Sequence, residues 1–207
     1  MEKIKWTKKL SSRIMKKIAD ILDKDYNSDE IQIAEYSVES ILMNIYKIPI
    51  IFIGAYLLGL FKEVTVMFFA MSFIRATAWG VHLKTGLGCL ILTVIDMYLV
   101  TSISRNINMN LVIGIFLLII AFGNYYKYAP ADTEDRPCLD ENVRIQMKKK
   151  TIVRFFLLVS IAILSKLYYS IIIYNIIILT LFVMSWMIHP LTYKIFDRGY
   201  RNYEKYS

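Results

Sequence analysis

The chain has 207 residues, of which 57% are hydrophobic, with only 8 Gly and 4 Pro and a formal net charge of +8. This apolar fraction exceeds that of ordinary soluble domains. Residues 106–126 and 167–193 contain no Asp, Glu, Lys or Arg, and both stretches are longer than the roughly 18 apolar residues that indicate a membrane-spanning helix. The composition therefore excludes disordered, collagen-like, coiled-coil and disulfide-stapled secreted chains. It predicts an all-α, polytopic integral membrane bundle.

The first 24 residues predict an amphipathic helix that lies on the membrane surface. Eight of them are basic and three are acidic, and Leu10, Ile14, Ile18 and Leu22 recur at helical spacing. An apolar stripe bordered by lysines is typical of a helix at the cytoplasmic leaflet, where anionic lipid is its partner. The alternative is a solvated basic arm that only fixes orientation. The segment lacks the apolar core and cleavage site of a signal peptide.

About six apolar segments of roughly 20 residues follow, and each is long enough for a transmembrane helix. They lie at 41–61, 64–81, 85–104, 109–126, 151–168 and 169–189. Because some of them carry charges, four spans with re-entrant pieces are the alternative. The segments fill most of the chain, so we expect one integral membrane domain over 1–207, with a long loop at 127–150 and a tail at 190–207.

The distribution of basic residues predicts the orientation of the chain. With the N-terminus in the cytoplasm, 19 Lys and Arg fall in cytoplasmic segments. Three, namely Lys62, Arg105 and Lys166, fall on the outer side of the membrane. The positive-inside rule therefore places both termini and the long loop in the cytoplasm. No basic stripe interleaved with aromatic residues lies on a soluble domain, so we expect no nucleic-acid partner.

Four charged residues lie far enough inside the predicted spans to fall at membrane depth: Lys47, Arg75, Asp96 and Arg154. Charges at membrane depth are costly and are usually paired or functional. Lys47 and Arg154 have long side chains that can reach an interface. Asp96 is short and lies near the middle of its span, so it needs a cation, and Arg75 on the neighbouring antiparallel helix is the candidate.

The residue types that carry out chemistry are densest around Gly80, His82 and Cys89. An imidazole can take the proton of a thiol and later return it to a leaving amine. Residues seven apart on an unbroken helix are separated by about 10 Å of rise. His82 and Cys89 can therefore meet only if the helix breaks between them, and the glycines at 80, 86 and 88 favour such a break.

The non-catalytic alternative is an inert buried Cys89 and a hydrogen-bonded interfacial His82. One His, one Cys and a distant Asp are too few ligands for zinc, so we expect no metal and no cofactor. Cys138 has no His beside it in the sequence and is interpreted as a bystander. His189 precedes Pro190 at the end of the last predicted span, and we expect it to cap a helix terminus there.

The long loop contains the stretch YAPADTEDRP at 128–137. Its prolines restrict the path of the backbone, which indicates an ordered loop near the site. Basic groups in the loop can attract an acidic peptide tail, although a solvated loop whose lysine run anchors the next span is the alternative. The candidate substrate-binding residues are Tyr128, Pro130, Asp132, Glu134, Arg136 and Pro137.

These two motifs, Arg75, Gly80, His82 and Cys89 together with the stretch at 128–137, resemble those of the accessory gene regulator B (AgrB) family of bacterial membrane cysteine endopeptidases. The Cys seven residues after the His is part of the family pattern. The resemblance extends over essentially the whole chain. Many members of the family have glycine at the position where this chain has Trp79.

The resemblance implies an enzyme of the bacterial cell membrane that removes the C-terminal tail of an AgrD-type quorum-sensing precursor and promotes thiolactone or lactone ring closure. It implies Cys89 as the nucleophile and His82 as the general base and acid. Arg75 and Gly80 would support the site. Apart from the resemblance, Asp96 lies seven residues after Cys89, where it can orient His82 or pair with Arg75, and we favour the pair with Arg75. A homodimer is also implied. The alternative function is a peptide exporter subunit without proteolytic chemistry.

Overall fold

The computed structural model describes residues 5–23, 25, 26, 31, 34, 35, 38, 42, 45, 47–83, 85–134 and 137–205. Its regular structure is helical. The helices are α1 (Lys5–Ile21), α3 (Lys47–Leu57), α4 (Phe61–Ala78), α5 (Gly86–Asn106), α6 (Leu111–Tyr128), α7 (Glu141–Tyr168), α8 (Ile171–Trp186), α9 (Pro190–Ile195) and the 3-10 helix η1 (Asn202–Lys205). Within these described residues the one β-type pairing is an isolated parallel bridge between Trp79 and Ala131. The predicted all-α membrane bundle is confirmed.

Helices α3 to α8 correspond to the six predicted spans. By length and apolar composition α5, α6 and α7 are able to cross a membrane, while α3 and α8 are apolar but shorter. The predicted start of the first span at residue 41 lies outside the described residues. Helix α7 begins at Glu141, so it contains the predicted fifth span at 151–168, and residues 141–150 of the predicted loop are helical.

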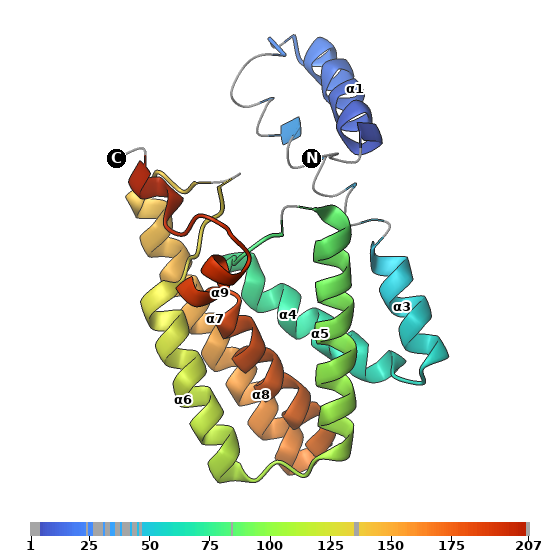
Figure 1. Cartoon of the computed structure of the whole chain (residues 1–207), viewed down its shortest axis with the longest axis vertical. Helices are drawn as coiled ribbons and strands as arrows, with labels where there is room; N and C mark the ends of the chain where they lie inside the picture. The colour runs from blue at the N-terminus through green and yellow to red at the C-terminus, as the bar shows by residue number, and fades with distance from the viewer. Residues whose placement is uncertain are drawn as a thin grey trace.

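Helix α8 lies at the centre of the bundle (Figure 1). It contacts α4, α5, α6 and α7, and most of its side chains are buried. Its sequence contains no charged residue, and a helix that is apolar on every side is typical of a protein interior or of a membrane span. The other helices are arranged around it, and together they position the ends that carry the site.

Side chains cap the starts of the helices as the sequence favours. Each accepts a hydrogen bond from a backbone N–H of the first turn, which would otherwise have no partner inside the helix. The capping residues are Thr85, Asn110, Asp140, Ser170 and His189. The predicted capping role of His189 is therefore confirmed, since its Nδ1 accepts from the N–H of Leu191 at 3.2 Å.

Arg154, one of the charges predicted inside a span, finds its partner on α4. Its Nη1 donates to the carbonyl oxygen of Phe73 at 2.8 Å, and its guanidinium lies 4.8 Å from the centre of the Phe73 ring. These contacts tie α7 to α4 and satisfy the cation without an acid.

The two ends of the bundle differ in what they carry (Figure 1). The links between α5 and α6 and between α7 and α8 lie at one end. The segment between α4 and α5, the loop between α6 and α7, and the C-terminal segment gather at the other end. The candidate residues of the two sequence motifs are therefore brought to the same end of the molecule.

Candidate active site

His82 lies in a non-helical segment between α4 and α5, so no continuous helix joins it to Cys89. Helix α4 ends at Ala78, and α5 begins only at Gly86, where the hydroxyl of Thr85 accepts the N–H of Gly88 at 3.1 Å. The described residues between the two helices, 79–83 and 85, form a connecting segment that carries His82. Because the helix is interrupted here, His82 and Cys89, which are seven residues apart in the sequence, are able to come into contact.

Two residues at the start of this segment have a positive φ angle. Trp79 has φ 58° and ψ −130°, and Gly80 has φ 127°. Such backbone conformations are routine only for glycine. A Cβ atom on residue 80 would also lie 3.1 Å from the carbonyl oxygen of Met187. The turn therefore requires glycine at position 80, and it strains Trp79.

Backbone hydrogen bonds hold the segment from both sides. The N–H of Gly80 donates to the carbonyl of Ala131 at 3.1 Å, and the N–H of Ala131 donates to the carbonyl of Ala78 at 3.0 Å. On the other side, the N–H of Val81 donates to the carbonyl of Met187 at 2.9 Å. The loop after α6 and the end of α8 thus fix the backbone immediately before His82.

His82 and Cys89 approach each other across the break. The Nδ1 atom of His82 lies 4.0 Å from the Sγ atom of Cys89, which is long for a catalytic hydrogen bond but typical of sites that tighten when substrate binds. His82 is exposed and Cys89, the fourth residue of α5, is partly buried. The imidazole is thus positioned where it can accept the thiol proton.

Arg75 lies beneath this segment. Its Nη2 donates to the carbonyl of Val81 at 3.3 Å, next to His82. The charge of Arg75 is felt at the carboxylate of Asp96, but these two described residues form no hydrogen bond or ion pair, so their predicted pairing stays a prediction. The hydrogen bond of Arg75 to Val81 also makes the guanidinium a support for the backbone that carries His82.

The carboxylate of Asp132 organises the loop after α6, a role that sequence reasoning missed. It is 2% exposed. Its Oδ1 accepts from the N–H of Asn202 at 3.0 Å, and its Oδ2 accepts from Tyr203 at 3.0 Å and Cys138 at 3.3 Å. Buried N–H groups need acceptors, and one carboxylate here supplies three of them with an acceptor. Asp132 thus fastens the C-terminal segment to the loop.

Glu134 makes a second connection of the same kind. Its Oε1 accepts from the N–H of Gly199 at 2.6 Å, and its Oε2 pairs with Arg198 at 3.1 Å. We call the contacts of Asp132 and Glu134 with residues 198–203 the tail latch. Arg136, the other charged candidate of this loop, lies outside the described residues.

Tyr193 joins the latch to the segment that carries His82. Its hydroxyl lies 3.1 Å from the carbonyl oxygen of Ala131 and 3.0 Å from that of Asp132. Burial raises the pKa of Tyr193, so the phenol stays protonated and can donate. Because Ala131 also pairs with Gly80, the tail, the loop and the His82 segment form one connected network.

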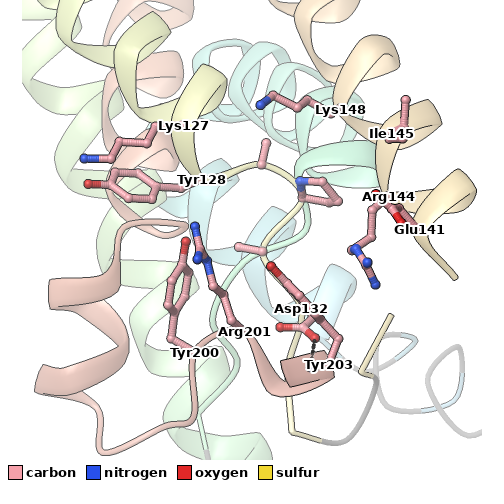
Figure 2. A pocket seen from close by; sticks show the side chains of 13 residues that line it. Lys127, Tyr128, Asp132, Glu141, Arg144, Ile145, Lys148, Tyr200, Arg201 and Tyr203 are labelled. Carbon is pink, nitrogen blue, oxygen red and sulfur yellow. Dashed lines mark hydrogen bonds between the residues drawn. The ribbon is translucent and has the colours of Figure 1, made fainter. Parts of the chain in front are cut away.

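Three other loop candidates lie near the latch. Tyr128 and Pro130 line a surface pocket between the loop and the C-terminal segment (Figure 2), and Pro137 is half-buried beside the latch. Because both residues line this pocket, both are accessible to a ligand that enters it.

Cys138 has a different environment from Cys89. Its Sγ donates to the carbonyl of Asp140 at 3.8 Å. Burial raises the pKa of the Cys138 thiol, and the charge of Arg144 only partly opposes this, while Asp132 and Asp140 reinforce it. Because the thiolate is the nucleophilic form, this environment suppresses the reactivity of Cys138.

Comparison with known proteins gives a consistent result. Residues 11–188 match the accessory gene regulator B family. A protein of Clostridium acetobutylicum named AgrB-like is 29% identical over 95% of each chain. AgrB-like proteins of Listeria innocua and Clostridium perfringens are 32% and 25% identical, over 94% and 89% of this chain and 96% and 90% of their own. No solved structure matches.

Proposed function

The chain belongs to the accessory gene regulator B family, and we propose that it is the membrane-embedded cysteine endopeptidase of a quorum-sensing system. Its substrate is an AgrD-type precursor peptide, whose C-terminal tail it removes. The retained part of the precursor then closes into a thiolactone or lactone ring.

The proposed reaction begins at Cys89. His82 takes the thiol proton, and the thiolate attacks the carbonyl carbon of the scissile peptide bond. The C–N bond then breaks, His82 returns the proton to the leaving amine, and the retained peptide is held as a thioester on Cys89. Attack by a thiol of the same peptide transfers the acyl group, closes the ring and frees Cys89.

Ring closure requires that water does not reach the thioester first. Exchange of one thioester for another is nearly balanced in energy, whereas hydrolysis discards that energy. Cys89 is partly buried at the start of α5, and buried Leu90 follows it. A site set among membrane helices limits the access of water to the intermediate.

The approach of His82 to Cys89, 4.0 Å between Nδ1 and Sγ, is the observation that carries the proposal. A hydrophobic cysteine in a packing role has no need of an exposed imidazole beside it. The interrupted helix, the glycine turn and the contact of Arg75 with Val81 all fix the backbone around His82, which is what a general base requires.

We also propose that the site faces the cytoplasm. The end of the bundle that carries the segment between α4 and α5 also carries the loop after α6, the start of α7 and the C-terminal segment (Figure 1). In the sequence, residues 79–85, 127–150 and 190–207 hold 11 of the 19 Lys and Arg outside α1. By the positive-inside rule this end is cytoplasmic. Both termini then lie in the cytoplasm, where a newly made precursor is available.

Replacement of Cys89 tests the proposal. Membranes containing Cys89→Ala are expected to leave a co-expressed AgrD-type precursor at full length, while Cys138→Ala processes it like the wild type. Precursor size is followed by gel mobility and mass spectrometry. His82→Gln, which keeps a polar side chain without a base, is expected to be as inactive as Cys89→Ala.

The same experiment separates the peptidase from a peptide exporter. Continued tail removal by the well-expressed Cys89→Ala protein would exclude the peptidase. An exporter without proteolytic chemistry predicts full-length precursor both with the wild type and with the variant, so processing by the wild type alone excludes that function.

A further inference from the structure

The nucleophile of the proposed reaction lies in the first turn of α5, and His82 lies in the non-helical segment before it. Cys89 is the fourth residue of α5, which begins at Gly86, and its Sγ lies 4.0 Å from the Nδ1 of His82. The first N–H groups of a helix have no acceptor inside it, so the first turn is stable only when another group caps it. The distance between Cys89 and His82 therefore depends on what holds the start of α5.

Thr85 holds the start of α5 at two points. Its backbone is extended, with φ −117° and ψ 140°, so the chain turns into the helix directly after it. Its hydroxyl oxygen accepts the N–H of Gly88 at 3.1 Å, and its carbonyl oxygen accepts the N–H of Cys89 at 3.1 Å. Thr85 thus binds the backbone of the nucleophile and of the residue before it.

Gly88 makes room for this cap. A Cβ atom on residue 88 would lie 2.8 Å from the Oγ1 atom of Thr85, whereas the next nearest atoms, those of Leu83, would lie 3.9 Å away or more. Glycine costs stability inside a helix relative to alanine. Among the described side chains, the Thr85 hydroxyl alone comes closer to this position than ordinary van der Waals contact, so the glycine fits the cap.

A second threonine holds the other side of Cys89. The Oγ1 atom of Thr93 donates to the carbonyl oxygen of Cys89 at 2.8 Å. The N–H and the carbonyl of Cys89 are thus each bonded to a threonine, one turn before it and one turn after it. His82 is fixed from elsewhere, because the residue before it is hydrogen-bonded to α4 and to the end of α8. The two reacting groups are therefore anchored to different parts of the molecule, and Thr85 lies where these parts join.

We propose that Thr85 is a positioning residue of the active site. Its hydroxyl, packed against Gly88, fixes the first turn of α5 and so keeps the sulfur of Cys89 within reach of His82. Thr85 acts through Cys89 and does not touch the reacting atoms. The inference rests on the proposed function for the reaction that this distance serves.

The first experiment measures the separation of residues 82 and 89 without catalysis. Cys89 and Cys138 are the two cysteines of the chain, so His82→Cys in a Cys138→Ala background leaves one pair of thiols, at 82 and 89. Dibromobimane, added to membranes that contain this parent protein, bridges two thiols only when they lie close together. Trypsin cleaves after Lys84, so mass spectrometry detects the bridge as a link between two peptides.

Thr85→Ala in this background is expected to slow the bridging about tenfold, because the loss of an N-cap side chain destabilises the first turn by a factor of this order. Thr85→Ser keeps the hydroxyl and is expected to bridge like the parent.

The matched control is Ser170→Ala. Ser170 caps α8 in the same way, since its hydroxyl accepts the N–H of Ile172 at 3.2 Å, but it lies at the opposite end of the bundle (Figure 1). Its replacement is expected to leave the rate of bridging unchanged. Equal bridging in Thr85→Ala and the parent, or equal slowing in Thr85→Ala and Ser170→Ala, would overturn the proposal.

The second experiment measures catalysis in the protein with His82 and Cys89 intact. Thr85→Ala is expected to lower kcat for tail removal about tenfold with KM unchanged, whereas Thr85→Ser keeps both values. Gly88→Ala is expected to lower kcat similarly by displacing the hydroxyl. The double variant is expected to lose no more than either single variant, because both changes remove the same contact. Additive losses, or a rise in KM alone, would overturn the proposal.

Failure of the positioning role and failure of the proposed function give different results. If bridging does not depend on Thr85 while the wild type removes the tail, the positioning role is wrong and the peptidase stands. If the wild type leaves the precursor intact while bridging depends on Thr85, the proposed function is wrong, and the cap still sets the separation of residues 82 and 89.

Discussion

Removal of the Asp132 carboxylate is expected to release the C-terminal segment from the bundle. This carboxylate accepts the N–H groups of Asn202 and Tyr203, each at 3.0 Å, and it is 2% exposed. Hydrogen bonds to a charged acceptor contribute about 1.5 to 3 kcal/mol each. Part of this is regained when the freed N–H groups reach water, so we expect Asp132→Ala to cost about 3 kcal/mol of latch stability.

A change of this size shifts the equilibrium between the docked and released tail by roughly 150-fold. Hydrogen–deuterium exchange at the amides of Asn202 and Tyr203 measures it directly. Asp132→Asn keeps one acceptor oxygen and is expected to fall between wild type and Asp132→Ala. Asp140→Asn is the matched control, because Asn is an equally good cap for α7. Wild-type protection of both amides in Asp132→Ala would refute the latch.

Three further predictions concern single positions around the site. Trp79→Gly is expected to be more stable than Trp79→Ala by about 1 kcal/mol in thermal unfolding. Residue 79 has φ 58°, and only glycine adopts this angle without strain. The reverse order of stabilities would exclude backbone strain at this position. Gly80→Ala is expected to lose about 1 to 3 kcal/mol and precursor processing, because its Cβ would crowd Met187, and a wild-type melting temperature would contradict this. Because the pKa of Cys138 is raised, its alkylation by iodoacetamide is expected to be slow at neutral pH and to accelerate as pH rises above the ordinary thiol range; a fast, pH-independent reaction would contradict it.

The helices follow closely from hydrophobic pattern and capping residues, and the main error shows where this reasoning fails. Helix α7 begins at Glu141, so the second half of the predicted loop at 127–150 is helical. The lysine run at 148–150 indicates the end of the apolar segment and not the end of the helix. A lysine run outside the apolar core is compatible with a helix when the side chains reach water. Asp140 then supplies the cap for the earlier start.

The site divides into a part that local sequence predicts and a part that it does not. The break between His82 and Cys89 was predicted because glycine and helix geometry are local properties. The contact of Asp132 with the N–H of Asn202 spans 70 residues and joins two irregular segments. No periodic pattern in the sequence therefore predicts it. The same holds for the pairing of Ala131 with Gly80, which depends on how the ends of α4 and α6 meet.

The most direct test of the proposed chemistry is to identify the covalent intermediate. Purified wild-type protein is incubated with an AgrD-type precursor, quenched in acid, digested and analysed by mass spectrometry. The account predicts a hydroxylamine-sensitive adduct on the peptide that contains Cys89, with the mass of the precursor without its tail, and no such adduct in His82→Gln. Tail removal without an adduct on Cys89, or with the adduct on Cys138, would contradict it.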